Sequence, residues 1–163
     1  SVSEAYRNSV INELESIYSD FNIDFSDKKS EFLGEYSTIF ISDKASKEFF
    51  TNRGWNWTLQ KSSDLVGNAH RDVGNKYKND NAYVFHEPLS TYSDPKNALI
   101  EAIAHEVGHI LGAGHSKDSN SVFYGGNTGN IGTIQDEEFM YLARVLGLKN
   151  NQIAYFDLDN ANT

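Results

Sequence analysis

The chain has 163 residues, of which 39% are hydrophobic and 13% aromatic, and this suits a single folded domain with its own core. The formal net charge of −9 argues against nucleic acid as a partner, because domains that bind nucleic acid are usually basic. The absence of cysteine excludes disulfides and thiolate metal sites, and no apolar run is long enough to span a membrane.

The hydrophobic pattern predicts a chain of mixed α and β structure. In chain order, we expect a helix at 3–18, strands at 21–25 and 36–41, a short helix at 44–50, strands at 64–70 and 82–86, and helices at 94–111 and 136–146. Ser3 is a suitable cap for the first helix, and Asp94 followed by Pro95 is typical of a helix start. Gly147 is expected to end the last helix.

The most informative stretch runs from His105 to His115 and has the form H-E-x-x-H-x-x-G-x-x-H. On a helix, His105 and His109 lie one turn apart on the same face, so that both imidazoles can bind one Zn²⁺. Glu106 lies about 100° further round the helix, where its carboxylate reaches a metal-bound water without being a ligand. Gly112 can end the helix in a left-handed conformation, so that the chain turns back and supplies His115 as the third ligand. Three protein ligands leave one position for water, which is the arrangement of a catalytic zinc.

This extended motif resembles the metzincin clan of zinc endopeptidases, and the continuation H-S-K-D at 115–118 resembles the matrixins and their bacterial relatives. The resemblance implies an α+β fold with an α/β-like upper half: a twisted mixed sheet, an active-site helix and a C-terminal helix. The family has another strand before its first helix, where only two residues stand here, so the sheet is expected to have four or five strands. One catalytic domain is expected over 1–163, with a polar tail at 149–163. The resemblance also implies a secreted, extracellular protein that acts as a monomer, although the polar start of this chain lacks a signal peptide.

The same resemblance implies hydrolysis of a protein or peptide substrate, with Glu106 as the general base. The substrate is expected to lie extended along the edge strand and beside the turn that follows the third histidine. The residues expected to bind it are Leu65, Val66, Gly67, Asn68, Ala69 and Tyr124. Two alternatives keep the metal without turnover: a zinc-containing module that binds a peptide or partner, and a purely structural metal domain. Glu106 weighs against both, because neither needs a base.

Metzincins carry a methionine in a tight turn below the zinc, and this chain departs from that pattern. The matrixin spacing places Phe123 at the methionine position, eight residues after His115. The only methionine, Met140, stands within a helical pattern. We expect Phe123 to form the apolar floor under the metal, although phenylalanine is bulkier and stiffer than methionine.

Other polar residues carry weaker signals. In matrixins, the region before and around the edge strand binds structural calcium and zinc, and His70, Asp72 and His86 are the candidates for such a site here. Their spacings do not match the matrixin pattern, so solvated polar residues are the favoured interpretation. Glu101 lies one turn before His105 and is either a partner of the metal ligands or a plain exposed residue.

Overall fold

The computed structural model describes residues 2–31, 33–53 and 65–149. In chain order, the elements are α1 (Glu4–Ile17), the 3₁₀ turn η1 (Lys29–Glu31), β1 (Thr38–Ser42), α2 (Ser46–Thr51), β2 (Gly67–Ala69), β3 (Asn81–Phe85), α3 (His86–Leu89), α4 (Pro95–Ile110) and α5 (Asp136–Leu146). A search of these described residues found no helix with the length and apolar character needed to cross a membrane.

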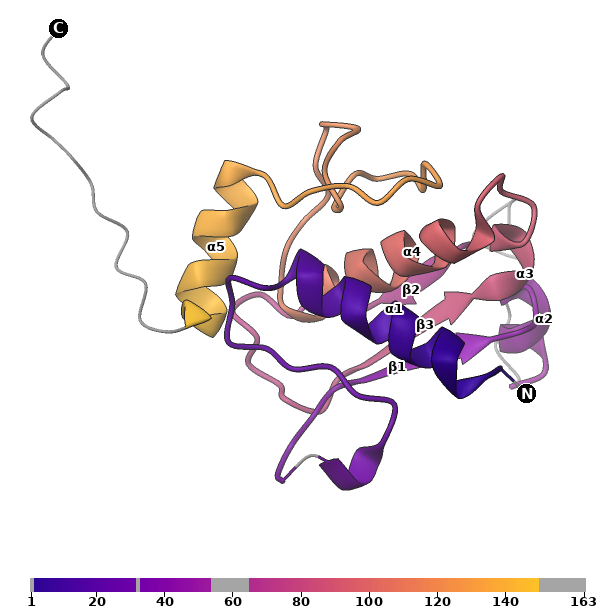
Figure 1. Cartoon of the computed structure of the whole chain (residues 1–163), viewed down its shortest axis with the longest axis horizontal. Helices are drawn as coiled ribbons and strands as arrows, with labels where there is room; N and C mark the ends of the chain where they lie inside the picture. Colours follow the sequence, from indigo (N-terminus) through magenta and orange to yellow (C-terminus); the bar gives the residue numbers. More distant parts are fainter. Residues whose placement is uncertain (1, 32, 54–64, 150–163) are drawn as a thin grey trace, which may run out of the picture.

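The sheet is mixed and has the strand order β1-β3-β2. β1 runs parallel to the central strand β3, whereas β2 runs antiparallel to it and forms the other edge. Side chains alternate between two faces: Val84 belongs to the main core, while Tyr83 and Phe85 pack with Phe49 and Phe50 of α2. α4 packs against all three strands and against α1, and these two helices cover the same face of the sheet (Figure 1).

α4 is the central element of the fold. Its start is fixed as expected, since the side chain of Asp94 accepts a hydrogen bond of 2.9 Å from the backbone N–H of Asn97, and Pro95 occupies the first turn. The helix is apolar almost all round, as suits a helix enclosed by a sheet on one side and α1 on the other. The hydroxyl of Tyr18, just after α1, donates to the carbonyl of Ala104 at 2.7 Å.

The segment at 21–25, which alternates like a strand, does not join the sheet. Phe21 makes only an isolated bridge with Leu148, and the N–H of Asn22 donates to the carbonyl of Gly147 at 3.1 Å. The alternating aromatic side chains instead pack against helices: the ring of Phe21 lies 5.1 Å from that of Phe139 on α5. The mixed α+β fold is therefore as expected, but the sheet of the described residues has three strands rather than four or five.

Several element ends follow local rules that the sequence already shows. Ser3 caps α1 by accepting from the N–H of Tyr6 at 3.2 Å, and Gly147 ends α5 with a φ of +75°. The short helix α3, which begins at His86, was not expected, because its four residues are too few for a periodic pattern. Part of the expected strand at 64–70 and nearly all of the expected polar tail lie outside the described residues.

Candidate metal centre

The last two turns of α4 carry His105, Glu106 and His109, and the chain turns sharply after them. Gly112 adopts a φ of +95°, a conformation that favours glycine. The N–H of Gly112 donates to the carbonyl of His109 at 2.8 Å, so the helix ends in a tight, hydrogen-bonded turn. This turn reverses the chain and brings His115 back to the two helical histidines.

The three imidazoles converge. One nitrogen of each of His105, His109 and His115 lies within 4.8 Å of the other two, and the Nε2 atoms of His109 and His115 are 3.1 Å apart. Tetrahedral zinc with Zn–N bonds of about 2.0–2.1 Å holds its nitrogens about 3.3 Å apart, so this spacing suits zinc. Among residues 2–31, 33–53 and 65–149, these histidines form the only group of three or more ligand-type side chains close enough to hold a metal.

Backbone carbonyls orient two of the imidazoles. Nδ1 of His105 lies 3.0 Å from the carbonyl oxygen of Val122, and Nδ1 of His109 lies 2.9 Å from that of Ala113. When Nδ1 carries the proton and donates to these carbonyls, Nε2 is left as a free electron-pair donor. Burial, reinforced by the neighbouring His109, lowers the pKa of His105 to about 4, and burial also lowers the pKa of His109. Both shifts favour the neutral imidazole, which is the form that binds a metal.

Glu106 is buried beside the histidines, with 5% of its surface exposed. Its Oε2 atom has no hydrogen-bond partner among the described residues, and burial raises the pKa of its carboxyl to about 8. Oε1 lies against the backbone of β2, where a Cβ atom on Gly67 would come within 2.2 Å of it. The carboxylate therefore points from α4 toward the edge strand rather than into the core.

A recess lies between α4, β2 and the loop that follows His115. All six residues expected to bind substrate line it together with the three histidines and Glu106, and five further residues complete the lining: Glu101, Ala102, Gly125, Gly126 and Asn127. The sequence pointed to the turn after the third histidine, but glycines and an asparagine in a loop carry no spacing signal, so it did not identify the individual residues at 125–127. The structure thus places the candidate substrate-binding residues and the candidate metal ligands around one cavity.

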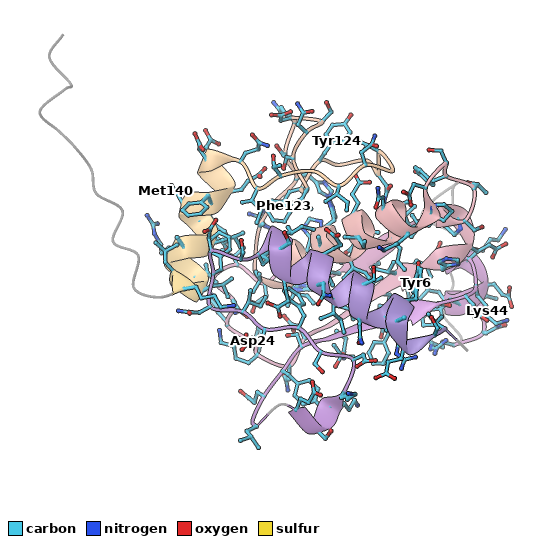
Figure 2. The ribbon with its side chains drawn as sticks, viewed as in Figure 1. Tyr6, Asp24, Lys44, Phe123, Tyr124 and Met140 are labelled. Carbon is cyan, nitrogen blue, oxygen red and sulfur yellow. The ribbon has the colours of Figure 1, made fainter. Side chains whose placement is uncertain are left out.

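The side chain of Phe123 is fully buried beneath the end of α4, whereas Met140 on α5 is 51% exposed (Figure 2). A Cβ atom on Gly108 would lie 2.0 Å from the ring of Phe123, so the ring touches the helix backbone between the two helical histidines. The turn is held by its own bonds: the N–H of Ser116 donates to the carbonyl of Phe123 at 2.7 Å, and the N–H of Phe123 donates to Oγ of Ser121 at 2.9 Å.

Two weaker signals from the sequence can be compared with the structure. Glu101 is not an exposed residue, since only 4% of its surface is accessible, and its carboxylate accepts hydrogen bonds from the loop at Thr128 and Gly129. His70, Asp72 and His86 form no metal-binding group within the described residues. Asp72 instead stabilises a turn, because its carboxylate accepts from the N–H of Tyr77 at 2.7 Å.

The fold and the histidine cluster together define a metallopeptidase of the metzincin type. Residues 7–137 match the profile of the matrixin peptidase family, and the chain belongs to that family. Among solved structures, archaemetzincin from Archaeoglobus fulgidus, crystallised with malonate, shares the fold with a TM-score of 0.52 and 16% sequence identity. The alignment covers 86% of this chain and 94% of that one. No curated protein sequence matches the chain. Family membership supports zinc as the metal and a protein or peptide as the substrate.

Proposed function

We propose that this chain is a zinc endopeptidase in which His105, His109 and His115 bind one Zn²⁺ and Glu106 is the general base. The observation that carries the proposal is the convergence of three imidazoles, two of them oriented by backbone carbonyls, beside a buried carboxylate whose Oε2 has no partner among the described residues. A buried carboxylate without a partner costs folding free energy, so it needs a functional reason to be there. A zinc ion bound by the imidazoles would lower the pKa of a water and polarise the scissile carbonyl.

The role of Glu106 follows from its position and its acidity. Glu106 lines the recess beside the imidazoles, where its carboxylate would accept a proton from the attacking water and then deliver that proton to the leaving amine. A carboxylate with a raised pKa is the stronger base, and a bound cation would move that pKa back toward neutral or acidic values. Its contact with Gly67 fixes the direction of the side chain.

The exposed edge of β2 supports binding of an extended substrate. β2 pairs only with β3 in the described sheet, so its other edge has free backbone groups along Gly67–Ala69. A peptide strand laid there would add to the sheet, with Tyr124 and the loop at 125–127 on the other side of the metal. Because such binding needs neither end of the peptide, we propose internal cleavage. By the same family resemblance, we propose a secreted monomer.

A peptide library with both ends blocked tests the proposal directly. The zinc-loaded protein should cleave blocked peptides, and a chelator should abolish the cleavage. Glu106→Gln should keep about one zinc per chain and lose activity by a factor of about a hundred or more. The exposed Glu13 on α1 provides the control, since Glu13→Gln should leave both zinc content and activity unchanged.

Two results would contradict the proposal. Loss of zinc from Glu106→Gln would make Glu106 a ligand rather than a base. Zinc-dependent peptide binding without any cleavage would instead assign the chain to the binding-module class.

A further inference from the structure

Glu101 lies on α4 one turn before His105, and it lines the same recess as the metal-binding candidates. Only 4% of its surface is exposed. Its Oε1 accepts from the N–H and the hydroxyl of Thr128, both at 3.0 Å, and its Oε2 accepts from the N–H of Gly129 at 2.8 Å. The carboxylate is therefore held rigidly at the wall of the recess by the loop that closes it.

Within the described part of the chain, the recess offers no lysine or arginine to offset the charge of this carboxylate. All three donors to Glu101 are neutral groups, and the residues that line the recess include a second carboxylate, Glu106, but no lysine or arginine. The N–H of Thr128 also lies 3.1 Å from Oε2, so these neutral donors occupy both oxygens of the carboxylate without neutralising its charge. A buried negative charge in this setting is strongly stabilised by a cation that enters from solvent.

We infer that Glu101 makes this recess selective for a lysine or arginine side chain on the residue that follows the scissile bond. The inference rests on the proposed endopeptidase function, which places the scissile bond at the imidazoles. Small residues at Ala102, Gly125 and Gly126 leave room for a long side chain, whose methylenes can lie along the walls while its charged end reaches Glu101.

The charge of a metal at the imidazoles does not cancel this preference. Glu101 stands four residues before His105, which is a rise of about 6 Å along the helix. A substrate cation in contact with Glu101 is thus closer to the carboxylate than to the metal, and Glu106 lies beside the imidazoles as a second negative group.

Three blocked peptides that differ only in the residue after the scissile bond test the inference: lysine, norleucine and glutamate. Norleucine keeps the four side-chain carbons of lysine without the charged ammonium group. The wild-type protein should cleave the lysine peptide with a kcat/KM about tenfold or more above that of the norleucine peptide, chiefly through a lower KM, and the glutamate peptide should be the poorest. Glu101→Gln should remove the preference for lysine over norleucine.

Two control variants separate the charge of Glu101 from its contact with the loop. Thr128→Val removes one hydrogen bond to the carboxylate but keeps the charge, so the loop loosens while the preference for lysine remains. Glu137→Gln makes the same charge change at an exposed position of α5 and should also keep the preference. If Thr128→Val abolished the preference as fully as Glu101→Gln, Glu101 would act only by holding the loop, and the inference would be overturned.

The wild-type comparison is decisive even if a variant fails to fold. Equal kcat/KM values for lysine and norleucine overturn the inference while leaving the endopeptidase function intact. If no peptide is cleaved, fluorescence anisotropy of end-labelled lysine and norleucine peptides gives the same comparison. Tighter binding of lysine then supports the inference although the proposed function has failed, and equal binding overturns both.

Discussion

At the residue scale, the environment of Glu106 distinguishes it from the histidines. The two helical imidazoles are satisfied by carbonyl groups of Val122 and Ala113, whereas Oε2 of Glu106 is buried without a partner in the part of the chain that the structure describes. The difference agrees with their proposed roles: ligands need a fixed orientation, and a base needs an oxygen free to take a proton. The unsatisfied carboxylate should have a measurable effect on the stability of the protein.

We predict that the stability of the metal-free protein falls between pH 5 and pH 8 because of Glu106. Burial raises the pKa of Glu106 from 4.5 to about 8, so folding favours the neutral carboxyl. The contribution of this neutral carboxyl to the free energy of unfolding is fully present below pH 4.5 and is lost as the pH rises through about 8. The loss amounts to about 2 to 4 kcal/mol. Thermal unfolding in the presence of a chelator should show that the stability of Glu106→Gln increases relative to that of the wild type as the pH rises. His105 titrates in the opposite sense in both proteins, so the difference isolates Glu106. A stability difference between the two proteins that does not change with pH would contradict the raised pKa of Glu106.

Gly67 offers a second test at this scale, because it is the backbone surface against which Glu106 rests. A methyl group on Gly67 would lie 2.2 Å from Oε1 and 2.7 Å from Cδ of that residue, so the carboxylate must move. We predict that Gly67→Ala keeps the zinc but lowers kcat by about tenfold or more, since small displacements of a catalytic group are costly. Gly126→Ala is the matched control for kcat, because its methyl group would meet Tyr124 only at 3.4 Å and would not meet Glu106, so any effect on substrate fit should fall on KM. Equal kcat values for the two variants in a peptide assay would refute the prediction.

Helix geometry predicted the residues of the motif, and the family resemblance supplied the residues that line the recess, but neither revealed the tertiary contacts that hold them. His105, Glu106 and His109 lie on one helix, and their relative positions follow from its 3.6-residue turn. The carbonyl of Val122 has no side-chain signature, and Glu101 shows its role only once the loop at Thr128 has folded over it. Neither contact could be deduced without the path of the chain after His115.

At the scale of elements, the segment after His115 is a structured turn rather than a loose loop. The N–H of Val122 donates to the carbonyl of Thr133 at 3.0 Å, and the N–H of Thr133 donates to the carbonyl of Asn120 at 2.8 Å. These bonds align the carbonyl of Val122 with His105 and press Phe123 against Gly108. One short element therefore both orients a metal ligand and supports the helix that carries it.

Phe123 is predicted to be the main packing residue of this element. Phe123→Ala should reduce the free energy of unfolding by about 3 to 5 kcal/mol, because it empties a fully buried site. Phe123→Met should cost less than about 1.5 kcal/mol, since methionine is apolar and adapts its shape. Met140→Ala, at a residue that is 51% exposed, should change stability by no more than about 0.5 kcal/mol. Urea denaturation of the zinc-loaded proteins measures all three. A larger loss for Met140→Ala than for Phe123→Ala would reverse the assignment of the floor residue.

Elements with strong hydrophobic periodicity were predictable from the sequence. Segments whose structure depends on packing against distant parts of the chain were not. α4 and α5 combine a cap or a terminal glycine with a long apolar stripe, and both form close to their expected bounds. The segment at 21–25 has the alternation of a strand, but its aromatic side chains find partners on helices instead. Period-two alternation over five residues cannot distinguish these outcomes, because it records which side chains are buried and not which backbone groups pair.

At the scale of the whole molecule, two tyrosines, one just after α1 and one on α5, donate hydrogen bonds to α4 and to the turn that follows it. Tyr18, which follows α1, donates to the carbonyl of Ala104 in the middle of the helix at 2.7 Å. Tyr141 of α5 donates to the carbonyl of Leu111 at 3.0 Å, and its oxygen accepts from the N–H of Gly74 at 3.0 Å. α5 stands at the end of the molecule where α4 gives way to the turn (Figure 1). The C-terminal helix thus contacts the metal site at two points: the hydroxyl of Tyr141 bonds the turn after His109, and Glu138 accepts from the hydroxyl of Ser121 at 2.7 Å.

This arrangement predicts that Tyr141 affects metal binding and that Tyr18 does not. The hydroxyl of Tyr141 contacts the turn between His109 and His115, where a Cβ on Gly112 would lie only 2.2 Å from it. Tyr141→Phe removes both of its hydrogen bonds and frees the turn that positions His115. Zinc affinity should fall by about tenfold, the lower range expected when a residue supporting a ligand is lost. Competition with a chromogenic chelator measures the change.

Tyr18→Phe is the matched control, because it removes one buried hydroxyl bonded to the same helix away from the turn. Each substitution should lower the free energy of unfolding by about 1 to 3 kcal/mol, as expected for a lost buried hydrogen bond. Only Tyr141→Phe should weaken zinc binding beyond this general loss of stability. The hydroxyl of Tyr141 bonds Leu111, which stands between the ligands His109 and His115 in the sequence, whereas the hydroxyl of Tyr18 bonds a residue before all three ligands. If both variants bound zinc as tightly as the wild type, the turn would be held by its own backbone bonds, and α5 would contribute to the core alone.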